Sequence, residues 1–317
     1  MPSIVAPELF VRLRGARNVL VCGAGGGFDV FAALPIGLAL ADLGVNVHFA
    51  NLTFTYLGGT DAVCLAPHLF AVTPDTEGEE RYFPERALAT WLRSAEMPSV
   101  VHAFEKVGVR PLTRAYATLA ARLSIDAVVL VDGGTDILMF GDEAGLGTPQ
   151  EDMVSLAAVA ALDVPTKLLA CLGFGVDSFH GVCHAHFLEN VATLERDGGY
   201  LGAFSVPRSS SEGTRFLDAV ALAGRLTPQR PSIVNESIAA AIRGEFGNVA
   251  LGERTAQSEL FINPLMGLYF TFELASVVRR SLYLEKLAAT ETIFQVSAII
   301  EAFRRGITVR PRRPIPH

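Results

Sequence analysis

Residues 18–43 read NVLVCGAGGGFDVFAALPIGLALADL, and this stretch decides the fold. The apolar run at residues 19–22 predicts a buried parallel strand, and residues 28–43 predict an apolar helix that ends at Gly44. Four glycines, Gly23, Gly25, Gly26 and Gly27, separate the two. A strand, a glycine loop and a helix in this order form the first unit of a doubly wound α/β fold.

The glycine loop predicts a ligand-binding site. Glycine is needed where the backbone takes positive φ or where a ligand comes close to main-chain N–H groups. The helix N-terminus behind the loop offers N–H donors and a partial positive charge, so an anionic group fits there. Asp29 lies in the first helical turn. It either complements the helix dipole or contacts a hydroxyl, an amine or a phosphate that is bound with a metal ion.

The spacing of the glycines excludes two common nucleotide motifs. The third glycine of the dinucleotide fingerprint is replaced by Phe28, and no Gly-Lys-Ser/Thr follows as in a P-loop. The spacing resembles the loop of adenosylmethionine-dependent methyltransferases. Those proteins and nucleotide dehydrogenases carry an acid at the end of the second strand, whereas Asn51 stands at that position here.

Composition limits the class of protein. Half of the 317 residues are hydrophobic, and the net charge is −7 without a long basic run, so we expect no nucleic-acid partner. The four cysteines form no C-x-x-C pair and residues 1–10 lack an apolar leader, which together predict a cytoplasmic protein. The apolar runs at residues 33–40 and 156–162 are too short to span a membrane. They predict helices packed on a sheet or in a homo-oligomer interface.

Strands and helices alternate up to about residue 225, which predicts a Rossmann-like, doubly wound, mostly parallel sheet. We expect residues 1–225 to form this domain and residues 226–317 to form a helical cap packed on it. Residues 100–107 fit a strand or a helix equally well. The predicted strands are 45–51, 126–131, 167–174 and 199–206, and the predicted helices are 84–93, 111–123, 151–162, 180–196, 209–224, 232–243, 265–276 and 282–304.

Polar, glycine-spaced clusters follow three of the predicted strands, at residues 23–29, 132–143 and 173–186. In an open α/β sheet the ligand crevice lies at the carboxyl ends of the strands. Three clusters in equivalent places therefore predict an active site at this edge, although Gly-Asp pairs also make tight turns and caps.

The second cluster begins with Asp132, Gly133, Gly134, Thr135 and Asp136. Two carboxylates on one loop can hold a divalent cation such as magnesium, or grip vicinal hydroxyls. The pattern resembles the calcium-binding, ribose-holding aspartates of nucleoside hydrolases over these five residues. Asp132 and Asp136 are thus candidate catalytic residues and metal ligands, and the residues between them are candidate ligand-binding residues. Most of the acids at 142, 143, 151 and 152 are interpreted as turn and helix-start residues.

The third cluster holds three histidines. His180 and His184 are four apart and would share one face of a helix over residues 180–196, a spacing that zinc helices use. Gly181 stands where a metalloprotease carries glutamate, so we favour His180 or His184 as general acid or base over a metal ligand. Asp177, just before the helix, is a candidate ligand-binding residue.

Taken together, these stretches resemble the prokaryotic family called domain of unknown function 1152. The resemblance includes the glycine loop with Asp29, residues 132–143, the run Gly147-Thr148-Pro149-Gln150-Glu151-Asp152, and residues 180–186. It covers most of the chain. It implies a Rossmann-like N-terminal part and leaves activity and substrate open.

The residues themselves favour a small-molecule enzyme, a hydrolase or group transferase that acts on a nucleotide, a riboside or a phosphorylated metabolite. Gly23–Gly27 would hold the anionic part, the aspartates a cation or hydroxyls, and a histidine would transfer a proton. Two alternatives stay open: a metabolite-binding regulatory protein without turnover, and an adenosylmethionine-dependent methyltransferase.

Overall fold

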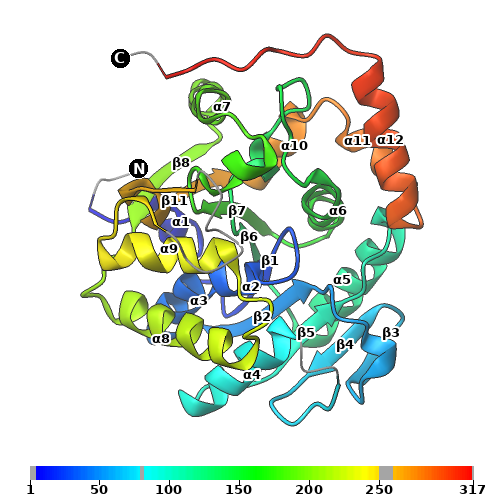
Figure 1. Ribbon diagram of the computed structural model, residues 1–317. Helices are drawn as coiled ribbons and strands as arrows, with labels where there is room; N and C mark the ends of the chain where they lie inside the picture. The colour runs from blue at the N-terminus through cyan, green and yellow to red at the C-terminus, as the bar shows by residue number, and fades with distance from the viewer. Residues whose placement is uncertain (1–4, 79–81, 250–259, 316–317) are drawn as a thin grey trace.

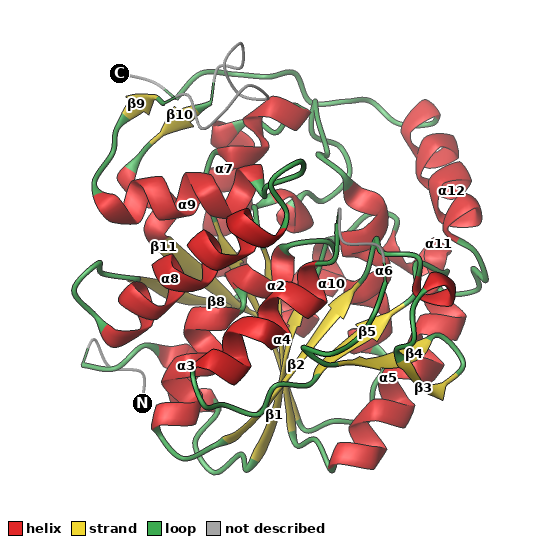
Figure 2. Ribbon diagram, turned by 60° about the horizontal axis from the view of Figure 1, so that its bottom comes forward, coloured by secondary structure: helices red, strands yellow, loops and turns green. Residues whose placement is uncertain are grey.

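The computed structural model describes residues 5–78, 82–249 and 260–315 (Figure 1). In this part of the chain the main sheet has nine strands in the order β3-β4-β5-β2-β1-β6-β7-β11-β8. Its strands are β1 (Asn18–Gly23), β2 (Asn46–Leu52), β3 (Val63–Ala66), β4 (Leu69–Val72), β5 (Val101–Phe104), β6 (Ala127–Asp132), β7 (Thr166–Leu172), β8 (Tyr200–Ser205) and β11 (Leu268–Glu273). A separate short pair, β9 (Gly247–Asn248) and β10 (Phe261–Ile262), lies beside α9 (Ile233–Arg243) (Figure 2).

The centre of the sheet is parallel and confirms the predicted α/β class. β5, β2, β1, β6 and β7 run parallel, with Val19 of β1 paired to Val47 on one side and to Ala127 on the other. The strands from β2 to β5 are added on one side of β1, and the strands from β6 onward are added on its other side. This reversal creates a switch point between β1 and β6, where ligands bind in Rossmann-like sheets.

Helices cover both faces of the sheet, and Figure 1 shows α4, α8 and α9 on one side and α5, α6 and α12 on the other. Successive side chains of β1 point to opposite faces, so Val19 and Val21 pack in one core and Leu20 and Cys22 in the other. The first core involves α1 (Glu8–Arg12), α2 (Asp29–Ala32), α3 (Leu34–Asp42), α4 (Pro84–Ser94), α8 (Ser211–Leu226) and α9. The second involves α5 (Val109–Leu123), α6 (Pro149–Ala160), α7 (His184–Arg196), α10 (Leu274–Arg280), α11 (Leu284–Leu287) and α12 (Ile293–Arg305). The described ranges also hold four 3-10 turns, η1 (Leu57–Gly59), η2 (Asp136–Leu138), η3 (Val176–His180) and η4 (Pro264–Gly267).

Most predicted elements before residue 245 are present, and residues 100–107, left open above, contain the strand β5. Two predicted helices are interrupted. Residues 28–43 form α2 and α3 with a break at Ala33, because Pro35 lacks an N–H and its ring excludes a continuous helix through this point. Residues 180–196 form the end of η3 and then α7, because Gly181 has a φ of +92° and ends the first turn.

The predicted helix at residues 265–276 is wrong. Residues 268–273 form the strand β11, which pairs antiparallel with both β7 and β8. Its sequence LYFTFE alternates between the two cores, with Tyr269 on one side and Phe270 and Phe272 on the other, and aromatic residues favour strands. The predicted helix at 282–304 is two helices, and α12 starts afresh with a capping box at Thr292. The segment after residue 225 therefore supplies a strand of the main sheet as well as helices.

The apolar segments that suggested an oligomer are buried within the chain. In α3 the side chains of Leu34, Ile36 and Leu38 are fully covered, and α6 is covered in the same way by α5, α10 and α12. The burial of these helices therefore needs no second copy. Across the described ranges, every helix is too short or too polar to cross a membrane. All four cysteines have free thiols.

Candidate functional site

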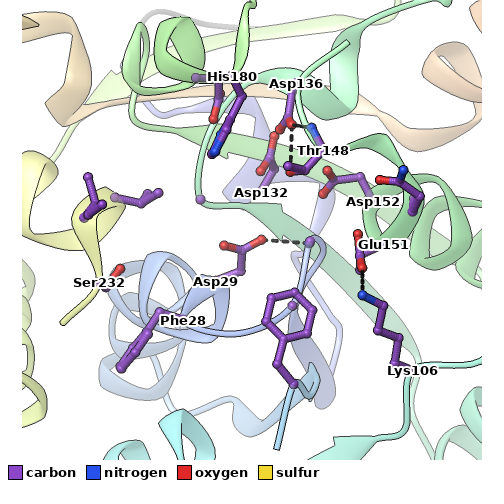
Figure 3. A pocket seen from close by; sticks show the side chains of 18 of the residues that line it. Phe28, Asp29, Lys106, Asp132, Asp136, Thr148, Glu151, Asp152, His180 and Ser232 are labelled. Atoms are coloured by element: carbon purple, nitrogen blue, oxygen red, sulfur yellow. Dashed lines mark hydrogen bonds and ion pairs between the residues drawn. The ribbon is translucent and has the colours of Figure 1, made fainter. Parts of the chain in front are cut away.

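A cavity of about 670 Å³ opens at the carboxyl ends of β1, β6 and β7. The loops after these strands and the first turns of α6, α9 and α12 line it. Figure 3 shows Asp29, Asp132, Asp152 and His180 pointing into this common space from four different segments. The site therefore lies at the switch point of the sheet, where three strand ends were predicted to meet.

The floor of the cavity is acidic. Asp132 and Asp152 are 2% and 1% exposed, and Asp29 is partly buried. One carboxylate oxygen from each of these three residues lies within 4.8 Å of the other two. Asp152 Oδ1 is buried and accepts no hydrogen bond from the part of the chain that the structure describes. Three convergent carboxylates with an unsatisfied oxygen match the donor set of a hard divalent cation.

The acids raise one another's pKa. Burial raises the pKa of Asp29 to about 7, and the charge of Asp136 adds to this, while the N–H of Gly25 lowers it. Burial also raises the pKa of Asp132 and of Asp152 well above the ordinary value, and neighbouring aspartates raise both further. Negative charge in this cavity is thus poorly compensated, and a bound cation would compensate it.

Two further aspartates are held in place by hydrogen bonds. Asp136 Oδ2 accepts from the backbone N–H of Thr148 at 2.7 Å and from its hydroxyl at 3.2 Å. Asp177 Oδ2 accepts from the backbone N–H of Thr135 at 2.6 Å and from its hydroxyl at 3.2 Å. The predicted metal pair is therefore divided, because Asp132 belongs to the triad of carboxylates and Asp136 lies beside it, fixed by Thr148. α6 begins at Pro149, two residues before the predicted start of this helix, and the Thr148 side chain bonds Asp136 and caps no backbone amide.

The glycines make room for carboxylates. A Cβ on Gly25 would stand 2.8 Å from Asp152 Oδ1 and 2.8 Å from Asp29 Oδ2. Gly133 and Gly134 leave similar room for Asp29 and Asp177, at 2.7 and 2.8 Å. The loop amides are engaged within the protein, since Gly25 N donates to Asp29 Oδ2 and Gly27 N donates to Leu52 O. The expected anion site on these amides therefore lacks two of its donors.

The predicted site residues divide into two groups. Those that line the cavity are Gly25, Gly26, Asp29, Asp132, Gly133, Asp136, Asp177 and His180. Those that lie behind the lining or elsewhere are Gly23, Gly27, Gly134, Thr135 and His184.

His180 and His184 do not share a helix face, because the break at Gly181 separates them. His184 stacks on Phe174 with ring centroids 5.1 Å apart and lines a second hollow of about 700 Å³. His180 alone of the two faces the acidic cavity.

Three charged residues that line the cavity, Lys106, Glu151 and Asp152, were not predicted as site residues. Lys106 forms an ion pair with Glu151, and its Nζ lies 5.1 Å from the centre of the Phe54 ring. Asp152 was interpreted as a helix-start acid, yet it completes the carboxylate triad. The sequence does carry a signal for Asp152, because it stands next to Glu151 at the start of a helix. A helix that starts beside the carboxyl ends of the strands places the acids of its first turn at the crevice.

The end of β2 carries no ribose-binding acid. Asn51 is fully buried and donates to Gly27 O at 2.6 Å and to Glu85 Oε1 at 2.7 Å. Its amide N–H groups therefore hold the glycine loop against α4 and face no ligand.

Comparison with known proteins agrees with the resemblance in the sequence. No curated protein matches the chain. The family described as "Protein of unknown function (DUF1152)" matches residues 61–308, which hold most of the cavity, although the glycine loop and Asp29 precede the matched region. Since the match covers most of its length, the chain belongs to the DUF1152 family.

Proposed function

We propose that this protein is a divalent-cation-dependent enzyme, a hydrolase or group transferase that acts on a nucleotide, riboside or phosphorylated metabolite. One observation carries the proposal: Asp29, Asp132 and Asp152 converge within 4.8 Å, and Asp152 Oδ1 is buried without a donor in the described residues. Buried carboxylates of this kind are retained where they bind a cation or act on a substrate.

Oxygen-only ligands favour magnesium, calcium or manganese over zinc. Such an ion would lower the pKa of a bound water and neutralise a phosphate that the acids otherwise repel. His180 faces the same space and is the candidate proton donor or acceptor. Asp136 and Asp177 are oriented by their threonine partners and would hold substrate hydroxyls.

A regulatory protein would use the same cavity without turnover, so product formation separates the two. The methyltransferase alternative gains no support from the end of β2, where Asn51 is engaged by Gly27 and Glu85.

The test is calorimetric titration with Mn²⁺ and Mg²⁺, followed by turnover assays on nucleotides, ribosides and sugar phosphates with and without chelator. Asp152→Asn should weaken Mn²⁺ binding at least about 10-fold, by analogy with other losses at metal sites. Asp163→Asn, at an exposed position away from the cavity, is the matched control and should bind like the wild type. Absence of Mn²⁺ and Mg²⁺ binding, or equal binding by the Asp152 variant, would refute the cation site.

A further inference from the structure

The cavity has an aromatic part as well as an acidic floor. Four aromatic side chains besides His180 line it: Phe28, Phe54, Tyr82 and Phe294. Phe28 and Tyr82 pack edge to face with ring centroids 5.4 Å apart, and Phe28 is 7% exposed. Phe54 and Phe294 are instead 47% and 82% exposed. Two rings that line a cavity and yet face solvent must lie at its mouth.

The position of Phe54 is built by the glycine loop. A Cβ on Gly26 would lie 3.0 Å from a ring carbon of Phe54, and a Cβ on Gly27 would lie 3.1 Å from another. Any larger residue at these positions would displace the ring. Lys106 Nζ lies 5.1 Å from the ring centre, within reach of a cation–π contact. The loop that was expected to bind an anion therefore also supports an aromatic side chain at the opening.

Phe294 is held on a well-defined helix. It lies in the first turn of α12, where Thr292 and Gln295 form a capping box that fixes the start of the helix. Within the described ranges no ring stacks on Phe294, whereas Phe28 and Tyr82 have each other. Leaving such a ring in water forgoes the free energy that a flat apolar partner would recover on binding.

We propose that the substrate is a nucleotide whose base stacks at the mouth on Phe294 and Phe54, while its ribose and phosphate face the carboxylates. This inference rests on the proposed function, because the floor must take the polar part of the same molecule. A sugar phosphate would satisfy the floor and leave both rings uncovered. A base has a π face for the rings, and base–aromatic stacking is tolerant of sequence because every base has such a face. The cavity of about 670 Å³ lies within the usual range of small-molecule sites.

The competing occupant of Phe294 is a second copy of the chain. We favour the nucleotide because Phe294 lines the same cavity as the buried carboxylates Asp29, Asp132 and Asp152. A contact between two copies of the chain would not require the exposed ring to share a cavity with these acids.

The test compares the four common nucleoside 5′-monophosphates with ribose 5-phosphate, by calorimetry in the presence of Mg²⁺. At least one nucleotide should bind about 5- to 150-fold more tightly than ribose 5-phosphate, the range expected for stacking of one base. Phe294→Ala should remove most of that difference and change ribose 5-phosphate binding less than about twofold, within ordinary non-additivity. Phe246→Ala is the matched control, because Phe246 is 68% exposed and lies outside the cavity lining.

Mn²⁺ binding is measured on the same samples, so that the two proposals fail separately. If Mn²⁺ binds but no nucleotide outcompetes ribose 5-phosphate, the base site is refuted and the cation site stands. If a nucleotide is preferred without Mn²⁺ or Mg²⁺ binding, the base site stands and the cation-dependent enzyme is refuted. If Phe294→Ala instead converts a dimer to a monomer and leaves nucleotide affinity unchanged, the mouth is an interface between copies and the inference is overturned.

Discussion

Glu85→Gln should stabilise the protein in a pH-dependent manner. Glu85 is fully buried in the first turn of α4, where its Oε1 accepts from Asn51 at 2.7 Å. Burial raises its pKa from 4.5 to about 7, although the hydrogen bond from Asn51 lowers it. The folded state therefore binds a proton more tightly than the unfolded state does. Stability from this group is full below pH 4.5 and is lost as the pH rises to about 7.

The size of the effect follows from the shift. The rise in the pKa of Glu85 from 4.5 to about 7 corresponds to about 3 kcal/mol once the carboxyl is ionised. Glutamine keeps an oxygen for Asn51 and mimics the protonated acid. The variant should gain about 3 kcal/mol over the wild type at about pH 8, and less than about 1 kcal/mol at about pH 5.

Urea unfolding of both proteins across this pH range gives the difference in their free energies of unfolding. The cavity acids titrate in both proteins, so their contribution cancels in this difference. Glu301→Gln, at an exposed position on α12, is the control and should change stability by less than about 0.5 kcal/mol at each pH. A variant whose advantage is constant with pH, or absent at about pH 8, would show that the pKa of Glu85 is not raised in the folded protein.

Three further predictions concern the site and its supports. Gly25→Ala should weaken Mn²⁺ binding at least about 10-fold with unchanged circular dichroism, because its Cβ would stand 2.8 Å from two site carboxylates. Gly267→Ala is the control and should bind Mn²⁺ like the wild type, because its Cβ would meet only an ordinary contact at 3.6 Å. Arg310→Met should lower the free energy of unfolding, measured in urea, by about 1–3 kcal/mol, because Arg310 forms ion pairs with three acids, one of them buried. Arg313→Met is the control and should lower it by less than about 1 kcal/mol, because Arg313 is 59% exposed and forms a single ion pair. Tyr269→Phe should cost about 1–2 kcal/mol in the same assay, because the buried hydroxyl donates to Ala32 O and ties β11 to α2; no loss would mean that this bond contributes nothing net.

The sequence predicts β1, β6 and β7 because each is a short apolar run that ends in or is followed by glycine, a local pattern. The prediction missed β11, because Leu268–Glu273 continues directly into α10 with no turn residues between the two elements, and its neighbours in the sheet are about 100 and 70 residues away along the chain. The same limit applies to Asp152, which local pattern assigns to a helix start. Only the packing of α6 against β6 brings it to Asp29 and Asp132.

Gly25, Gly26 and Gly133 line the candidate cavity, for a reason that differs from the expected one. The loop was predicted to approach a phosphate through its amides, and the structure uses Gly25 and Gly133 to let carboxylates approach one another. A glycine in a sequence indicates a position where a side chain would not fit, but it does not show which group takes the place of the missing Cβ. That depends on side chains from other elements, here Asp29 and Asp152.

Glu143 and Asp152 are both buried acids, but they differ in whether the protein itself supplies hydrogen-bond donors to their carboxylates. Both are essentially inaccessible to solvent. Glu143 accepts from the N–H groups of Phe140 and Gly141 and from Asn190, and it pairs with Arg310. Its charge is thus compensated within the protein, and its removal would only loosen the fold. Asp152 has one oxygen without a donor in the described residues and faces two more carboxylates. Such an arrangement costs stability in the protein alone, and a cation bound as we propose would offset that cost.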